Sequence, residues 1–206
     1  MWKTVVGISL TSCMCAIADD TCTKPSVSVQ CSGRLRDGVV AVGGETTGTT
    51  ISFNHLTWEL QFHDANARRF AQNHNKEVVN VTGTLRRIAG TEIKERWIVD
   101  VTTLSERDAT TGKEGARLSV QGTIRATDPR TGGSPALRID SDGQKWPIDC
   151  ASDVRLQAEA DSLVGQPVLL TGSLKQVTEE DSDKPVVILV RTLKRATNVP
   201  IHDPSN

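Results

Sequence analysis

The strongest constraint on the fold is an internal repeat. Four blocks recur in the same order, and the pairs are Val79–Leu85 with Val168–Leu174, Trp97–Leu104 with Val186–Leu193, Val27–Gln30 with Leu118–Gln121, and Trp58–Leu60 with Trp146–Ile148. The first two pairs are 89 positions apart (168 − 79 and 186 − 97), the third 91 and the fourth 88. Four ordered blocks at nearly one offset indicate duplication of a unit of about eighty residues, a plausible small domain.

The repeat divides the chain into a leader, two domains, a linker and a tail. The linker sequence RDATTGKEG is polar and contains two glycines, and the tail contains Pro200 and Pro204. We predict a signal peptide at 1–18, a first domain at 19–106, a linker at 107–115, a second domain at 116–196 and a flexible tail at 197–206.

Each copy shows the same order of apolar patterns, which predicts three strands, a helix and two further strands. In the first copy the predicted elements are strands at Val27–Gln30, Thr49–Phe53 and Trp58–Phe62, a helix from Asp64 to Asn73, and strands at Val78–Leu85 and Trp97–Leu104. In the second copy they are strands at Leu118–Ile124, Ala136–Ile139 and Lys145–Ile148, a helix at Cys150–Leu163, and strands at Val168–Leu174 and Pro185–Leu193. Asp64 suits a helix N-cap, and Gly165 suits a C-cap.

This element order resembles the OB-fold, a five-stranded Greek-key barrel with a helix after the third strand. We therefore predict an all-β chain with one short helix per domain, folded as two tandem five-stranded OB-like barrels. The stretches Val39–Ile51, Trp58–Leu60 and Val81–Leu85 also resemble a group of exported bacterial proteins of planctomycete type. That resemblance implies export and a duplicated barrel, and it brings no activity with it.

The first residues have the pattern of a targeting segment. A positive Met1-Trp2-Lys3 start and the apolar run Thr4–Leu10 precede Ala16-Ile17-Ala18, which is the order of a secretory signal. We predict cleavage after Ala18 and a periplasmic or secreted protein. Alternatively, Leu10–Cys13 is a lipobox, Cys13 is lipidated, and the protein is a membrane-anchored lipoprotein. The sequence contains no run of eighteen apolar residues, so we predict no transmembrane segment.

Cysteine usage fits an oxidising compartment. Cys22 and Cys31 lie nine positions apart with Pro25 between them, a spacing that would allow a disulfide after export. Two free thiols are the alternative.

One loop of the first copy is a candidate ligand-binding site. It consists of Gly43, Gly44, Glu45, Thr46, Thr47 and Gly48. In an OB-fold this loop connects the first two strands beside the binding face, and its glycines would let a ligand approach the backbone. A bulged turn that needs the glycines for its own geometry is the alternative, and we favour it. We interpret Trp58 and Trp146 as repeated core residues between sheet and helix.

Composition argues against a nucleic-acid partner. Lys plus Arg number 24 against 25 Asp plus Glu, the net charge is −1, and aromatic residues are 3% of the chain. A chain that neutralises phosphates and stacks bases normally has more positive charge and more aromatic residues than this one.

No catalytic motif, metal-ligand spacing or cofactor-binding pattern is present, so we predict no catalytic residue, metal site or cofactor. The predicted function is an exported, non-enzymatic binding or interaction module of the cell envelope, with an envelope protein or a small ligand as partner. One alternative is a hydrolase of envelope sugars that uses dispersed carboxylates such as Glu45 and Glu59. A weaker alternative, oligonucleotide binding, follows from fold analogy alone.

Overall fold

The computed structural model describes residues 25–40, 46–91, 95–107, 114–127, 136–151, 153–176 and 186–196. The first half of the chain contains β1 (Ser26–Asp37), β2 (Thr49–Phe53), β3 (Leu56–Gln61), α1 (Ala65–Asn73), β4 (Val78–Ala89) and β5 (Glu95–Glu106). The second half contains β6 (Gly115–Ala126), β7 (Leu137–Ser141), β8 (Gln144–Asp149), α2 (Val154–Ser162), β9 (Pro167–Gln176) and β10 (Val186–Arg195). The predicted strands and helices are therefore present, in the predicted order.

The strands of the first half close on themselves. Pairing runs β1–β2–β3–β5–β4 and returns to β1, and every pair is antiparallel except β3 with β5. The strands of the second half pair in the same way, as β6–β7–β8–β10–β9 and back to β6, with β8 and β10 parallel. This is the connectivity of the five-stranded OB-like barrel that the element order predicts.

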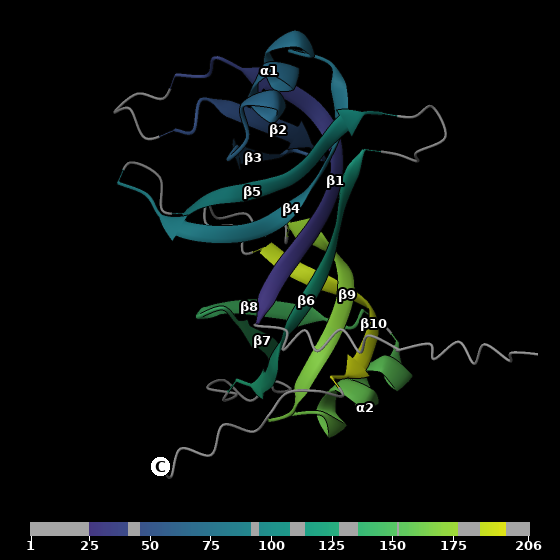
Figure 1. Cartoon of the computed structure of the whole chain (residues 1–206). Coiled ribbons are helices and arrows are strands. Elements are labelled where there is room, and N and C mark those ends of the chain that lie inside the picture. The colour runs from purple at the N-terminus through teal and green to yellow at the C-terminus, as the bar shows by residue number, and fades with distance from the viewer. Residues whose placement is uncertain are drawn as a thin grey trace, which may run out of the picture.

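The two halves are joined along β1 and β6. These strands pair antiparallel from Ser26 opposite Gln121 to Ser32 opposite Gly115, and Figure 1 shows them side by side along the middle of the molecule, with α1 and α2 at opposite ends. All ten strands therefore belong to one sheet.

The register of this junction corrects one offset in the repeat. Val29 pairs with Gly83 and Leu118 pairs with Gly172, so Val29 and Leu118 occupy equivalent positions, 89 residues apart. The sequence match of Val27 with Leu118 is thus displaced by two residues, and an even shift leaves each side chain on its predicted face. Val29 also lies directly opposite Leu118, which makes the β1–β6 pairing locally two-fold symmetric.

Gly33 and Gly122 allow β1 and β6 to change partners. β1 pairs with β6 up to Ser32 and with β2 from Arg34 onward. A Cβ on Gly33 would lie 2.6 Å from the carbonyl oxygen of Ser52, and one on Gly122 would lie 2.3 Å from that of Asp140. Only glycine permits this close approach of two backbones.

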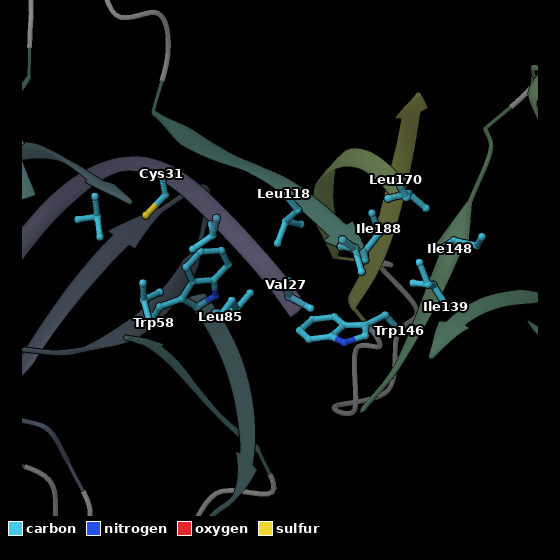
Figure 2. Close-up of a cluster of buried hydrophobic side chains, with 14 of the residues drawn as sticks. Val27, Cys31, Trp58, Leu85, Leu118, Ile139, Trp146, Ile148, Leu170 and Ile188 are labelled. Carbon is cyan, nitrogen blue, oxygen red and sulfur yellow. The ribbon is translucent and has the colours of Figure 1, made fainter. Parts of the chain in front are cut away.

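The core is continuous through both halves, and Figure 2 shows Val27 and Leu118 lying between Trp58 on one side and Trp146 on the other. Trp58 and Trp146 are each 1% exposed, which confirms that they are core residues. Their aromatic neighbour is a third tryptophan. The Trp97 ring lies parallel to Trp58 at 6.2 Å and edge-on to Trp146 at 5.5 Å between ring centroids. Trp97 therefore bridges the two halves, a contact that the prediction of separate sheet-to-helix anchors did not include.

The two helices begin at capping aspartates. Asp64 accepts hydrogen bonds from the backbone N–H groups of Asn66 and Ala67, as predicted. The predicted start of α2 at Cys150 is wrong, because Ala151 has a φ of +52° and the helix begins after Asp153. Gly165, with a φ of +82°, lies two residues beyond the C-cap, Leu163.

Candidate functional site

The predicted glycine-rich loop is described only in part. Gly43, Gly44 and Glu45 lie outside the described residues, whereas Thr46, Thr47 and Gly48 form the approach to β2. The Gly48 N–H donates to Thr46 Oγ1 at 3.1 Å, and its carbonyl accepts from the Val39 N–H at 2.9 Å. The polar groups of Thr46 and Gly48 are thus used within the turn itself, and a ligand site in this loop stays a prediction.

The cysteine predictions are likewise largely outside the described residues, which exclude Cys13, Cys22 and the whole leader at 1–18. Cys31 is buried in β1, and burial raises the pKa of its thiol to about 12. The disulfide with Cys22, lipidation of Cys13 and export stay predictions.

Each half has an outward face on its first three strands, and the two faces can be compared position by position. In the first half, Arg36 pairs with Thr50, which pairs with Glu59. In the second half, Arg125 pairs with Arg138, which pairs with Pro147. We call the outward side chains of β1–β3 the first face and those of β6–β8 the second face.

Glu59 is held at the centre of the first face. Arg96, on β5, donates from Nε to Glu59 Oε1 and from Nη2 to Glu59 Oε2, both at 2.7 Å. The side chains of Arg96 and Glu59 are only 12% and 13% exposed. Burial alone would raise the pKa of Glu59, but hydrogen bonds from Arg96 and the Thr47 N–H outweigh burial and lower the pKa. This carboxylate is therefore a structural ion-pair partner and is unsuited to general acid catalysis.

The second face presents cations. Arg125 and Arg138 share one carboxylate, because Arg138 Nε lies 2.9 Å from Asp140 Oδ1 and Arg125 Nε lies 4.0 Å from Asp140 Oδ2. The Arg125 side chain is 54% exposed. Lys145 lies opposite Asp140 in the sheet and is exposed. Asp140 and Asp149 offset part of this charge, and the first face likewise has two exposed cations, Arg34 and Arg36. Exposed cations of this kind can contact an anion.

A polar groove of about 620 Å³ lies at the junction of the halves. It is found where β6 begins beside the β2–β3 turn, so Asn54 and Gly115 line its end. Its other polar lining residues are Gln30, Ser32, Asn80, Thr82, Arg117, Ser173 and Arg191 on the sheet and Glu114 just before β6, and its apolar ones include Phe53, Leu56, Val81 and Leu174.

Arg87 connects the β4–β5 hairpin to the second half through hydrogen bonds and contacts with tryptophan rings. Its guanidinium lies 4.2 Å from the centroid of the Trp146 ring and 5.5 Å from that of Trp97. Arg87 also donates to Gln144 Oε1 at 3.1 Å and to the Lys145 carbonyl, while Gln144 Nε2 donates to the Arg87 carbonyl. Burial lowers the pKa of Arg87, and nearby Glu95 opposes that shift.

Among the described residues, no group of three or more His, Cys, Asp or Glu side chains is placed to hold a metal ion. Within the same ranges, no helix is long and apolar enough to cross a membrane.

The structure resembles solved structures that share this fold. The crystal structure of the single-stranded DNA binding protein from Thermus aquaticus matches with a TM-score of 0.53 and 13% identity, over 88% of this chain and 98% of that chain. A deletion mutant of the same protein matches with a TM-score of 0.51 and 12% identity, over 87% of this chain and 99% of that one. No protein-family model and no curated protein sequence matches the chain. These matches support an OB-fold-like barrel.

The matches also correct the predicted function. The expectation of a non-enzymatic envelope module with no nucleic-acid partner is wrong, because the two structures above, which match 88% and 87% of this chain, are of a single-stranded DNA binding protein. The physical reason is that a net charge of −1 averages over the whole chain. The whole-chain value does not show where cations gather, such as Arg125, Arg138 and Lys145 on neighbouring strands of the second face.

The sequence reasoning missed Arg125, Arg138 and Lys145 because no local motif marks them. The available signal was the alternation of buried apolar and outward-facing positions along each predicted strand. Each lies next to a buried apolar residue of a predicted strand, so each outward position could have been listed and its charge compared between the two copies.

Proposed function

We propose that each closed circuit of five strands is one OB-fold domain, that the two domains arose by duplication, and that the chain binds single-stranded nucleic acid. The observation that carries the proposal is the fold match over nearly the full length of a single-stranded DNA binding protein. In OB-folds the second and third strands and the loops beside them form the surface that binds oligonucleotides. In this chain those strands are β2 and β3 in the first domain and β7 and β8 in the second.

Three cations on this surface support the proposal, of which Arg125 and Lys145 are exposed and Arg138 is partly buried beside Asp140. Arg125, Arg138 and Lys145 lie on or beside β7 and β8 and can contact successive phosphates of a strand. Phosphate contacts supply sequence-independent affinity that falls as salt rises.

The aromatic side chains define the mode of binding. Every described tryptophan and phenylalanine is buried or partly buried, and the rings of Trp58, Trp97 and Trp146 contact one another or the core. Base stacking, which usually adds about 1–3 kcal/mol per base, therefore contributes little. We expect binding that depends on the backbone of the strand and is nearly indifferent to base identity.

A fluorescence-anisotropy titration tests this function. The full chain is added to labelled oligo-dT, oligo-dA and oligo-dC of about 35 nucleotides, enough for two OB-folds at up to about 16 nucleotides each. At about 50 mM salt we expect dissociation constants on the order of 1–10 μM for all three, rising steeply by about 200 mM salt. A duplex of the same length serves as control and should bind more weakly. No anisotropy change at about 100 μM protein in low salt would overturn the proposal.

A further inference from the structure

The groove at the junction of the halves is built mainly by strands outside the proposed nucleic-acid surface. Its lining residues come from β1, β4, β6, β9 and β10, and β2 and β3 reach it only near the turn that joins them. Its volume of about 620 Å³ lies within the range of pockets that hold small organic molecules, roughly 300–1,000 Å³. The groove is therefore large enough for a ligand of its own.

Two arginines line the groove. Arg117 lies on β6 and Arg191 on β10, and β9 pairs with both strands and lies between them. With about 4.8 Å between neighbouring strands, β6 and β10 are roughly 10 Å apart, a gap that two arginine side chains can close around one anion. Both side chains are exposed, and neither has a hydrogen bond or an ion pair with any residue that the structure describes.

A β-bulge directs Arg191. Val190 and Thr192 pair with adjacent residues of β9, and Arg191 between them has no cross-strand partner. Such a bulge changes the direction of a side chain and is common beside binding sites. The first half has the same bulge at Thr102. The bulge therefore belongs to the repeated fold, whereas the cation on it belongs to the second half alone.

The equivalent positions of the other half also lack the second cation, since Arg117 corresponds to Ser28, 89 positions earlier. Over all the residues that line the groove, the charged ones are the two arginines and Glu114. At the positions that correspond to this lining, the only charged residue is Asp142. The positive charge is therefore a property of this groove and not a general feature of the barrel.

The rest of the lining suits a polar organic molecule. The side-chain amides of Gln30, Asn54 and Asn80 can donate and accept hydrogen bonds. Leu56 and Leu174, both partly buried, add apolar surface. The single carboxylate of the groove can accept hydrogen bonds from hydroxyl or amino groups. A ligand with an anionic group, several hydroxyl groups and a flat body would use all of these features.

We propose that this groove binds a nucleoside phosphate. Arg117 and Arg191 hold the phosphate, because the planar guanidinium group matches phosphate geometry. Glu114 and the amides bind the sugar and the base, and the leucines contact the face of the base. The inference goes beyond the proposed function and does not rest on it, since the strand is proposed to lie on β2, β3, β7 and β8.

Titration calorimetry of the full chain at about 50 mM salt tests the proposal. The probes are the four ribonucleoside diphosphates, with inorganic pyrophosphate and the ribonucleosides as controls for the two parts of the ligand. We expect at least one diphosphate to bind with a dissociation constant of about 100 μM or lower. Pyrophosphate should bind at least about tenfold more weakly, and the ribonucleosides more weakly still.

The repeat supplies the variants. Arg117→Ser and Arg191→Thr introduce the residues that the first half has at the equivalent positions, so both should fold, which thermal unfolding checks. Each should weaken binding of the diphosphate about tenfold or more through loss of a charge-assisted contact. Arg155→Gln, which removes an exposed cation from α2, is the control and should stay within about twofold of wild type.

The outcomes separate this site from the nucleic-acid surface. The inference is wrong if no diphosphate binds at about 1 mM, if pyrophosphate binds as tightly as the diphosphates, or if the groove variants bind like Arg155→Gln. Both groove variants should bind oligo-dT within about twofold of wild type. If they lose oligo-dT binding together with diphosphate binding, the groove belongs to the nucleic-acid surface and the inference fails while the function stands. If wild type binds a diphosphate but no oligo-dT, the function fails and the inference stands.

Discussion

Gly83 illustrates, for a single residue, how tightly the strands cross. A Cβ at this position would lie 2.3 Å from the carbonyl oxygen of Asp100 and 2.8 Å from Val99 Cγ1. Gly172, 89 positions later, has the same surroundings, with the Leu189 carbonyl at 2.4 Å. These two glycines belong to the repeated TG pairs in the sequence, so the repeat preserves a steric requirement of the barrel.

Gly83→Ala should destabilise the protein, because the methyl group must displace backbone of β5. We expect a loss of about 1–3 kcal/mol in the free energy of unfolding, the usual cost of overpacking. Urea denaturation measures it. Thr84→Ala, at the exposed next position of β4, is the control and should change stability by less than about 0.5 kcal/mol. Equal stability of Gly83→Ala and wild type would contradict the close crossing.

Glu59→Gln tests the ion pair at the first face. Because the pKa of Glu59 is lowered in the folded protein, its charge stabilises the fold above the ordinary value of 4.5 and loses that effect as pH falls through the lowered pKa. The variant should be about 1–2 kcal/mol less stable than wild type near neutral pH, through loss of charge-assisted hydrogen bonds. Denaturation at a series of pH values should show this gap shrink in acid. A stability difference between Glu59→Gln and wild type that does not change with pH would contradict a stabilising Glu59–Arg96 ion pair.

At the scale of secondary-structure elements, the β4–β5 hairpin connects the halves through Arg87. Arg87→Met keeps the apolar contact with Trp146 and Trp97 but loses the hydrogen bonds to Gln144 and the Lys145 carbonyl. We expect a loss of about 1–3 kcal/mol and faster hydrogen exchange in β8.

The matched control for this change is Arg86→Met. Arg86 pairs with Asp100 near the surface, where an ion pair contributes at most about 1 kcal/mol. Exchange in β8 should stay as in wild type for this variant. If both variants leave β8 equally protected, Arg87 does not connect the halves.

The elements themselves were largely predictable, since the strands alternate and Asp64 marks the start of α1. Several boundaries were not, and two of them have a clear physical reason. β1 continues to Asp37 although Gly33 weakens a strand pattern, because Gly33 is needed where β1 crosses β2. The start of α2 was placed too early because helical spacing alone cannot show the positive φ of Ala151.

At the scale of the whole molecule, the sequence predicted duplication but not how the copies meet. The β1–β6 pairing and the Arg87 contacts join residues far apart in the chain, and no local pattern encodes such contacts. Net charge was misleading for a related reason. It sums over the whole chain and does not show that Arg125, Arg138 and Lys145 lie on neighbouring strands of one face.

The central claim is that single-stranded nucleic acid lies across the strands that follow β1 and β6, which are β2 and β3 in the first half and β7 and β8 in the second. Amide hydrogen exchange of the full chain, with and without oligo-dT at low salt, tests it most directly. The account predicts added protection in β2, β3, β7 and β8, with little change in α1 and α2, which lie at opposite ends of the molecule. Protection confined to the helices or to the groove around Arg117 and Arg191, with β7 and β8 unchanged, would contradict it.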